Sequence, residues 1–340
     1  MESIVSGERA RMKITDLGDR RRVELVGRLH TYENGSTSSV VFETPYSEAF
    51  LRLVVRSKSI EFLKDEIDRE AEPNYLREPM RRLLGRFLDL ERLGACDVLD
   101  YGCGGAASSV TLARILPRAR ITGIDVSPNT IEIGRARLRE LGMEDRIEIR
   151  LTSPDGPLPF EAERFDIVLC DGVLEHIPRR RRAHYLGEIW RVMRRGGHLF
   201  IRETPNRLFP FEGHTSRLPF VHWLPLALAG AIVRALSPNK LRACSNANLA
   251  EDGFIGVTYS EVLRCIRAGG GVPTDLTRSN PACVDDFFHF WLVREHRPLH
   301  RTAKLAIRIS FRVLHAAMRP LGTPVAALLP SLDLCIRKDG

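Results

Sequence analysis

The stretch "VLDYGCGGAASSVTLA", residues 98–113, decides the fold of this chain. A short apolar run ends in an acid, a cluster of glycines follows, and small and apolar residues then continue at helical spacing. A strand, a tight turn and a helix in this order are typical of a nucleotide-binding α/β unit. Gly102, Gly104 and Ala107 satisfy the loose form of a dinucleotide turn, but glycines alone do not separate one cofactor from another.

The same alternation of strand and helix continues along the chain. We expect strands at 96–101, 120–125, 147–151, 165–171 and 197–203, and helices at 107–116, 129–142 and 182–195. The strand runs are continuously apolar, which is expected where helices cover both faces of a sheet. The pattern therefore predicts an α/β fold with a parallel, doubly wound sheet.

The first 75 residues have a different pattern. Two β-rich runs within residues 22–44 are separated by Asn34-Gly35, a signal for a hairpin. Residues 46–71 then have helical periodicity, and an amphipathic helix is expected over 76–94. We predict an N-terminal extension over residues 1–75, made of a hairpin and a helix, and a main domain over 76–340.

Two acids restrict the choice of cofactor. Asp100 ends the first strand just before the glycines, where a carboxylate would repel a pyrophosphate but attract the ammonium group of an amino acid. Asp125 ends the next strand, about where an acid binds ribose hydroxyls. One acid for an ammonium group and one for a ribose indicate S-adenosylmethionine rather than NAD.

Four motifs then resemble those of class I S-adenosylmethionine-dependent methyltransferases, including those of ubiquinone and menaquinone biosynthesis. Residues 98–113 resemble the first motif, and "ITGIDVSPNTIEIGRAR" resembles the acidic loop that follows it. "LPFEAERFDIVLCDGVLEHIP" is similar to the region of the fourth strand, and "EIWRVMRRGGHLFIRETPNR" to that of the fifth. The motifs occur in the family's order over about residues 76–207, and a weaker similarity continues to "SLDLCIRK" near the end. The resemblance implies a Rossmann-like methyltransferase sheet that binds S-adenosylmethionine.

The resemblance also implies a set of cofactor-binding residues. Asp100, Tyr101, Gly102 and Gly104 would line the methionine side, Asp125 the ribose, Val126 the adenine and Asp171 the cofactor edge. Two departures from the family pattern stand out. Ala106 replaces a common glycine, and "TSPDGPLPF" leaves the adenine-amine contact to Asp155 or to Ser153. The alternatives are a turn cap for Asp100 and a helix N-terminal acid for Asp125.

The motifs do not identify the methyl acceptor. A sulfonium methyl is already electrophilic, so the enzyme mainly aligns the acceptor, and a hydroxyl acceptor also benefits from a general base. His176, just past the fourth strand, and His214, past the fifth, are the candidate bases at the ligand-binding edge of the sheet. Either could instead be a hydrogen-bonded residue that fixes a loop, and Glu175 is expected to be such an anchor.

Residues 207–257 form a longer connection than the fold needs, so we expect a helical insertion that covers the acceptor. Its aromatic residues Phe209, Phe211, Phe220 and Trp223 suit an apolar acceptor. The alternative is a helical layer that only completes the core.

Composition restricts the remaining partners. The net charge is +8, but only six of the 51 basic residues are Lys, and no aromatic-basic RNA module is present, so nucleic acid is not expected. The seven cysteines form no CxxC pair, which predicts reduced thiols and no metal site. The charged N-terminus lacks the apolar core of a signal peptide, so a cytoplasmic location is expected. Residues 301–319 form a basic amphipathic pattern that would suit peripheral contact with the inner membrane face, or packing on the domain itself.

The sequence thus predicts S-adenosylmethionine-dependent methyl transfer to a small-molecule, lipid or glycan acceptor, at oxygen. Two alternatives remain open, a non-catalytic scaffold with the methyltransferase fold and an NAD-dependent oxidoreductase. The sequence indicates no oligomeric state.

Overall fold

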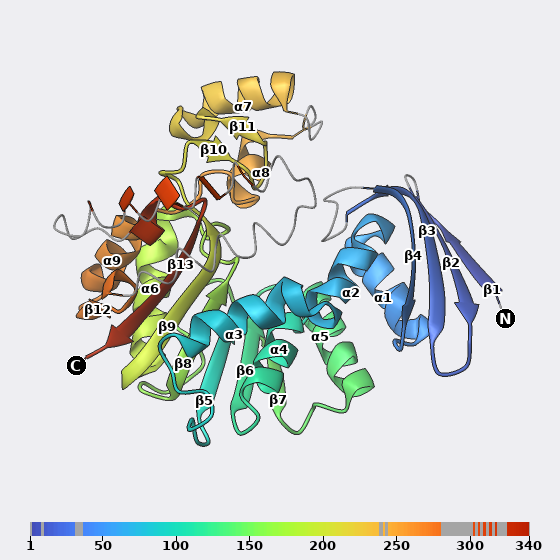
Figure 1. Cartoon of the computed structure of the whole chain (residues 1–340), viewed down its shortest axis with the longest axis horizontal. Helices are drawn as coiled ribbons and strands as arrows, with labels where there is room; N and C mark the ends of the chain where they lie inside the picture. The colour runs from blue at the N-terminus through green and yellow to red at the C-terminus, as the bar shows by residue number, and fades with distance from the viewer. Residues whose placement is uncertain are drawn as a thin grey trace. The chain divides into compact units, whose positions relative to one another are not determined.

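A computed structural model describes residues 2–7, 10–30, 37–237, 241, 244–279 and 325–339, together with isolated positions between 302 and 317. The chain divides into two compact units (Figure 1). The first unit comprises Met1–Arg81, Leu93–Ala95 and Gly102–Pro154, and the second comprises Arg82–Arg92, Cys96–Tyr101 and Asp155–Gly340.

The first unit begins with an antiparallel sheet in the order β1-β2-β3-β4. Its strands are β1 (Glu2–Ser6), β2 (Ala10–Asp16), β3 (Arg21–Leu29) and β4 (Thr37–Thr44). The helices that follow are α1 (Glu48–Lys58), η1 (Ile60–Phe62), α2 (Leu63–Ala71) and the π-helical turn η2 (Pro73–Arg77). Strands β2 and β3 alternate buried and exposed residues, and their buried face packs on α1 and α2.

The rest of the first unit supplies the glycine turn and two strands of the main sheet. Its elements are α4 (Ala107–Ile115), β6 (Arg120–Asp125), α5 (Pro128–Leu141) and β7 (Ile147–Leu151). Strands β6 and β7 run parallel. Ile133 and Ala136 of α5 belong to the same hydrophobic core as the N-terminal sheet, so the extension and α5 fold around one core.

The second unit holds most of the main sheet and its C-terminal helices. Its strands are β5 (Asp97–Tyr101), β8 (Phe165–Asp171), β9 (Met193–Pro205), β12 (Pro273–Asp275) and β13 (Ser331–Lys338). The helical elements beside them are η3 (Arg179–Arg181), α6 (Arg182–Val192), α9 (Tyr259–Ala268), η5 (Thr277–Ser279) and η7 (Val325–Leu328). Helix α3 (Glu78–Gly85) belongs partly to each unit.

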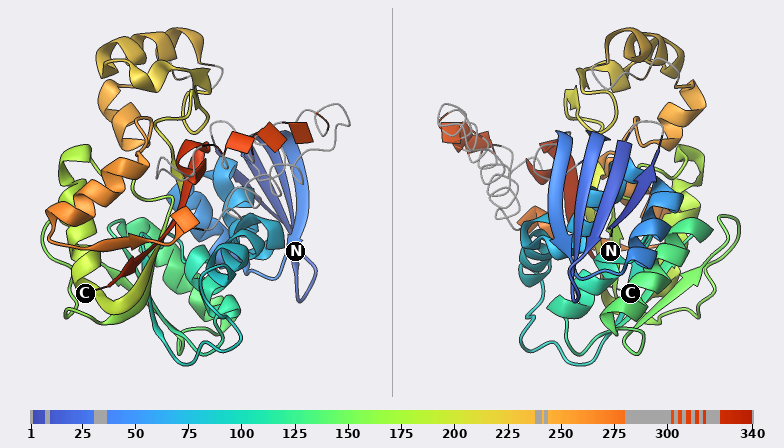
Figure 2. Two further views of the ribbon diagram at one scale, coloured as in Figure 1. Left: turned by 60° about the vertical axis from the view of Figure 1, so that its left-hand side comes forward. Right: turned by 90° about the vertical axis from the view of Figure 1, so that its right-hand side faces the viewer.

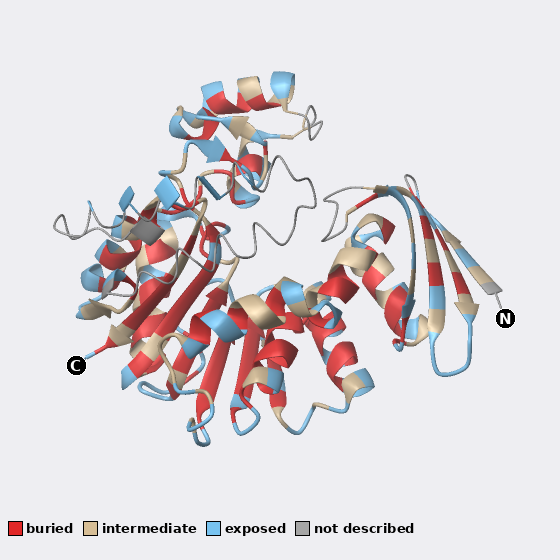
Figure 3. Cartoon of the chain, in the orientation of Figure 1, coloured by how far each residue is buried: buried red, intermediate tan, exposed pale blue. Residues whose placement is uncertain are grey.

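Seven strands form one mixed sheet in the order β12-β13-β9-β8-β5-β6-β7. Strands β5, β8 and β9 pair in parallel and form its largely buried centre, drawn mostly in red in Figure 3. The α/β fold class with a Rossmann-like sheet is confirmed, but an all-parallel sheet is wrong. Strand β13 runs antiparallel to β9 because the chain returns at Pro330, beside Asn206 at the carboxyl end of β9.

The insertion over residues 207–257 has a small hydrophobic core of its own. It comprises β10 (Phe211–Glu212), β11 (Leu218–Pro219), η4 (Val221–Trp223), α7 (Leu226–Leu236) and α8 (Asn246–Glu251). The views of Figure 2 show α7 gathered with this hairpin and α8. Among the described residues, no helix has the length and apolar character needed to cross a membrane.

Several expected element bounds are wrong. The expected helix over 46–71 is broken because Ser59 has a left-handed φ of 79°, which ends α1. The helix expected to reach Arg195 ends at Val192, since Gly196 with φ 74° and its neighbours belong to β9. Helix α3 ends at Gly85 rather than near residue 94. Strands β1 and β2 were not expected, so the hairpin of β3 and β4 is half of a four-stranded sheet. The prediction for 301–319 lies outside the described residues, apart from isolated positions.

Candidate functional site

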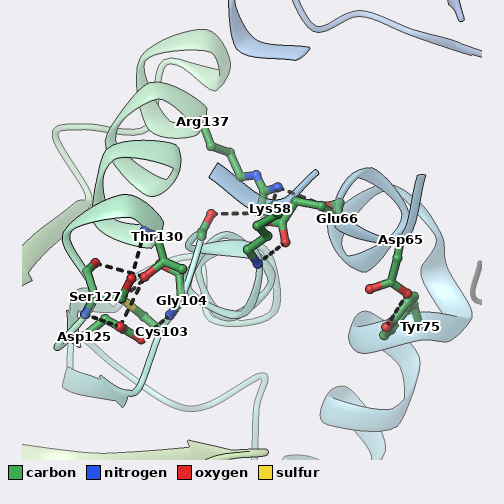
Figure 4. Close-up of polar contacts among 11 residues, drawn as sticks. Lys58, Asp65, Glu66, Tyr75, Cys103, Gly104, Asp125, Ser127, Thr130 and Arg137 are labelled. Atoms are coloured by element: carbon green, nitrogen blue, oxygen red, sulfur yellow. Dashed lines mark hydrogen bonds and ion pairs between the residues drawn. The ribbon is translucent and has the colours of Figure 1, made fainter. Parts of the chain in front are cut away.

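In the first unit, the glycine turn and Asp125 are joined by hydrogen bonds (Figure 4). One carboxylate oxygen of Asp125 accepts from the backbone N–H of Gly104 at 3.0 Å. The other accepts from the N–H of Ser127 at 2.8 Å and from the hydroxyl of Thr130 at 3.2 Å. Ser127 also caps α5. Asp125 therefore fixes both the turn and the start of α5, and a carboxylate has room for further donors such as ribose hydroxyls.

The turn has the open backbone that S-adenosylmethionine would need. Gly104 has a φ of 52°, and a Cβ added there would meet no atom within 4 Å. Val126, next to Asp125, exposes 54% of its surface. An open turn, an acid that still has accepting capacity and an exposed apolar side chain beside it fit the amino-acid, ribose and adenine parts of S-adenosylmethionine.

The remaining residues predicted for the cofactor belong to the second unit. Asp100 and Tyr101 end strand β5 and are buried. Asp171 ends β8, where Arg202 of β9 holds its carboxylate with contacts of 2.9 and 3.0 Å. Asp155 is exposed and forms an ion pair with Arg181 at 2.6 Å. The roles of these residues toward a cofactor stay predictions, and for Asp155 the pair with Arg181 is a competing use of the carboxylate.

The second unit brings both candidate bases together with Glu175. The rings of His176 and His214 have centroids 5.9 Å apart, and Nε2 of His176 lies 3.9 Å from a carboxylate oxygen of Glu175. One nitrogen or oxygen of each of the three residues lies within 4.8 Å of the others. Glu175 is buried, whereas both histidines are exposed, so the acid lies beneath two accessible rings.

The loops around this acid–histidine cluster (Glu175, His176 and His214) hold the rings in place. Nδ1 of His176 lies 2.8 Å from the carbonyl oxygen of Glu251, an arrangement that places the ring proton on Nδ1 and leaves Nε2 as an acceptor. The buried carboxylate of Glu212 accepts from the N–H of His214 at 2.9 Å.

Gly253 packs directly against the acid–histidine cluster. Its φ is +80°, and a Cβ there would lie 2.7 Å from Cγ of Glu175 and 3.3 Å from Cε1 of His214.

The protonation of the cluster follows from its surroundings. Burial, with a contribution from Asp171, raises the pKa of Glu175 to about 8. Desolvation by surrounding atoms and the neighbouring His176 lower the pKa of His214. Near neutral pH, Glu175 therefore holds a proton and His214 is uncharged.

The sequence did not predict a metal site, yet the cluster offers one carboxylate and two imidazoles. These are donor types that bind divalent metal ions. Within the described part of the chain, this is the group of three such side chains whose ligand atoms lie close enough together to bind one metal ion. The cysteine pattern could not reveal it, because its members are 39 residues apart and none is a cysteine.

Sequence reasoning also missed the residues that support the cluster. Glu212, Glu251 and Gly253 fall in the insertion, where no repeating pattern indicates which side chains meet. A glycine between charged and aromatic residues, as in "AEDGF", was the one local signal of a constrained turn.

The surface of the insertion carries apolar side chains. Among them, Phe211, Phe220 and Trp223 are 46%, 53% and 46% exposed, and the last two pack together with centroids 5.2 Å apart. Phe220 has a left-handed φ of 58°, unusual for an aromatic residue.

Known proteins share the region of the chain that contains the glycine turn and the central strands of the sheet. Residues 98–197 match a family model described as a methyltransferase domain. A ubiquinone biosynthesis O-methyltransferase from Stutzerimonas stutzeri is 30% identical over 201 residues, which cover 58% of this chain and 83% of that protein. Its counterpart from Azoarcus sp. is 28% identical over 172 residues, covering 49% and 70%.

Among solved structures, geranyl diphosphate C-methyltransferase from Streptomyces coelicolor matches with a TM-score of 0.43 and 18% identity, over 80% of this chain and 83% of that one. It was solved with Mg²⁺, geranyl diphosphate and S-adenosyl-L-homocysteine. With the methyltransferase domain and the relatives above, the chain belongs to the class I S-adenosylmethionine-dependent methyltransferases.

Proposed function

We propose that this methyltransferase methylates a hydroxyl oxygen of a small organic acceptor, and that the acid–histidine cluster accepts the hydroxyl proton. The observation that carries the proposal is the approach of Glu175, His176 and His214, with one donor or acceptor atom of each within 4.8 Å of the others. Two accessible imidazoles over a buried acid suit proton removal from a weakly acidic hydroxyl.

In this proposal, one set of residues binds the cofactor and another removes the acceptor's proton. S-adenosylmethionine supplies an electrophilic methyl group when bound. Asp125 and the turn at Gly104 would hold its ribose and amino-acid parts, and Val126 its adenine. Nε2 of His176 does not take part in the contact to Glu251 and takes the acceptor's proton, while the neutral His214 beside it offers a second nitrogen acceptor for that proton. The oxygen then carries the charge needed for attack in line with the S–CH₃ bond.

We propose an aromatic hydroxyl on an apolar molecule as the acceptor. The exposed Phe211, Phe220 and Trp223 on the insertion favour an apolar body, and an imidazole base favours a phenol over an alcohol because a phenol is the stronger acid. The relatives named for ubiquinone biosynthesis agree with this class. We also propose a cytoplasmic enzyme that touches the inner membrane face through residues 301–319, whose described positions expose Leu305, Ile309 and Val313.

A labelled-methyl assay tests the acceptor. The chain is incubated with methyl-labelled S-adenosylmethionine and a prenylated catechol, a monosaccharide or RNA. We expect label in the catechol alone, as an acid-stable methyl ether. Label only in the sugar or RNA would refute the proposed acceptor. Cofactor binding without transfer to any acceptor, cell extracts included, would favour a scaffold.

A second experiment tests the base. His176→Ala should lower kcat by about 10²-fold with an ordinary catechol, and much less with a nitrocatechol that is already ionised. His184→Ala, an exposed histidine of the same unit outside the cluster, serves as the control and should leave kcat unchanged. An equal loss with both acceptors would refute the role as a base. If a chelator abolished wild-type activity and a divalent cation restored it, the cluster would be a metal site instead.

A further inference from the structure

Arg137 of α5 lies at the centre of a buried contact in the first unit (Figure 4). Its side chain is fully buried. One guanidinium nitrogen donates to the carbonyl oxygen of Gly105 at 2.8 Å, and another donates to the side chain of Glu66 at 2.8 Å and to its carbonyl oxygen at 3.0 Å. Arg137 therefore joins the glycine turn to helix α2 of the N-terminal extension.

Glu66 is present as a carboxylate in this contact. Although burial raises its pKa, Arg137 and Lys58 together bring the pKa of Glu66 down to about 2. Lys58 donates to the second carboxylate oxygen at 2.6 Å. Each carboxylate oxygen of Glu66 thus has a cationic partner.

The turn leaves no free space on the side that faces Glu66. A Cβ at Gly105 would lie 2.4 Å from the carboxylate oxygen of Glu66 that binds Arg137. On the other side, a Cβ at Gly134 of α5 would approach Cβ of Ala106 to 3.2 Å. The backbone of Gly105 and Ala106 is therefore enclosed by α2 and α5, whereas Gly104 stays open.

The turn also needs restraint. Ala106 has a left-handed φ of 64°, a conformation that an alanine adopts at a free-energy cost and keeps only where neighbouring contacts enforce it. The bond from Gly104 to Asp125 restrains one end of the turn, and the bond from Arg137 to Gly105 restrains the next residue.

We propose that Arg137 and Glu66 are positioning residues for S-adenosylmethionine, which act through the backbone of Gly105 and make the N-terminal extension part of the cofactor-binding apparatus. The proposal rests on the cofactor site proposed above at Gly104, Asp125 and Val126. Because the turn and α2 share this contact, cofactor binding and the packing of α2 stabilise each other.

The double variant Glu66→Leu/Arg137→Met tests this coupling. It replaces the buried ion pair by apolar side chains of similar length, a change that commonly leaves a protein folded. We expect a melting temperature close to that of the wild type and a Kd for S-adenosylhomocysteine raised about tenfold, measured by calorimetry. The control, Arg56→Ala/Glu132→Ala, removes an exposed 3.0 Å ion pair between α1 and α5 that does not touch the turn, and should leave Kd unchanged.

A folded double variant with wild-type Kd would overturn the proposal. If the double variant does not fold, hydrogen exchange on the wild type decides. S-adenosylhomocysteine should slow exchange in Leu63–Ala71 and leave Arg21–Leu29 of the same unit unchanged, and equal exchange in Leu63–Ala71 with and without the ligand would refute the coupling. Wild-type protein that binds neither S-adenosylmethionine nor its product would instead reject the cofactor site, and the proposal with it.

Discussion

At the scale of single residues, Asp125 has two uses that one experiment can separate. Its carboxylate accepts from Gly104, Ser127 and Thr130, and we expect it to accept from the ribose as well. Asp125→Asn keeps the shape but removes the charge, which should weaken S-adenosylmethionine binding by about 1–3 kcal/mol in calorimetry.

Thr130→Val is the matched control for Asp125, since it removes contacts inside the protein alone, the 3.2 Å bond to Asp125 and the 3.0 Å bond to the carbonyl oxygen of Ser127. It should change the binding free energy by less than about 0.5 kcal/mol. Equal losses in the two variants would show that Asp125 acts through the fold and not on the ribose.

At the scale of elements, the sequence predicted the parts that repeat a pattern. The strands β5, β6, β7 and β8 lie where continuous apolar runs placed them, and the expected tight turn follows β5, with Gly102 and Gly104 in left-handed conformations. The reversal at β13 could not be predicted, because strand direction depends on where the chain re-enters the sheet. Strand β2 was missed because charged residues such as Arg11 and Lys13 alternate with its buried residues and interrupt the apolar pattern.

The candidate site was also predictable only in part, where a regular element positions the residue. His176 follows a recognisable strand, so its place at the carboxyl edge follows from periodicity and topology. Its approach to His214 depends on Glu251 and Gly253, which belong to an irregular insertion and meet the cluster only through tertiary packing. The contact of Arg137 with Glu66 and Gly105 could not be predicted either, because a single buried acid in an amphipathic helix produces no recognisable sequence pattern.

The loop after α8 supports the cluster, and Gly253→Ala tests this. The added Cβ would lie 2.7 Å from Cγ of Glu175, so the acid or the loop must shift. We expect kcat to fall by about tenfold or more, because small displacements of a base are costly.

Gly270→Ala separates this contact from backbone strain. Gly270 has a nearly equal φ of +83°, but a Cβ there meets nothing within 4 Å. Gly270→Ala should lose about 1 kcal/mol of stability in denaturant unfolding from backbone strain alone, Gly253→Ala should lose more because of its contact with Glu175, and only Gly253→Ala should lose activity. A similar loss of kcat in Gly270→Ala would contradict the role of the Glu175 contact.

At the scale of the whole molecule, the buried Glu175 should make stability depend on pH. The pKa of Glu175 is about 8 in the folded chain, against an ordinary pKa of 4.5 for an exposed glutamate. Between these values the folded state holds a proton that the unfolded state has lost. The contribution of Glu175 is therefore fully present below pH 4.5, declines as the pH rises, and is lost once the pH exceeds 8.

Glu175→Gln keeps a neutral side chain at every pH and removes this dependence. Between pH 5 and pH 9 the wild type should lose about 2–4 kcal/mol more stability than Glu175→Gln, measured by denaturant unfolding at both pH values. Glu144→Gln, a change at an exposed position, is the control and should follow the wild type. If wild type and Glu175→Gln lost the same stability, Glu175 would be ionised in the folded chain, and the cluster would then present a carboxylate rather than a neutral acid beneath its two histidines.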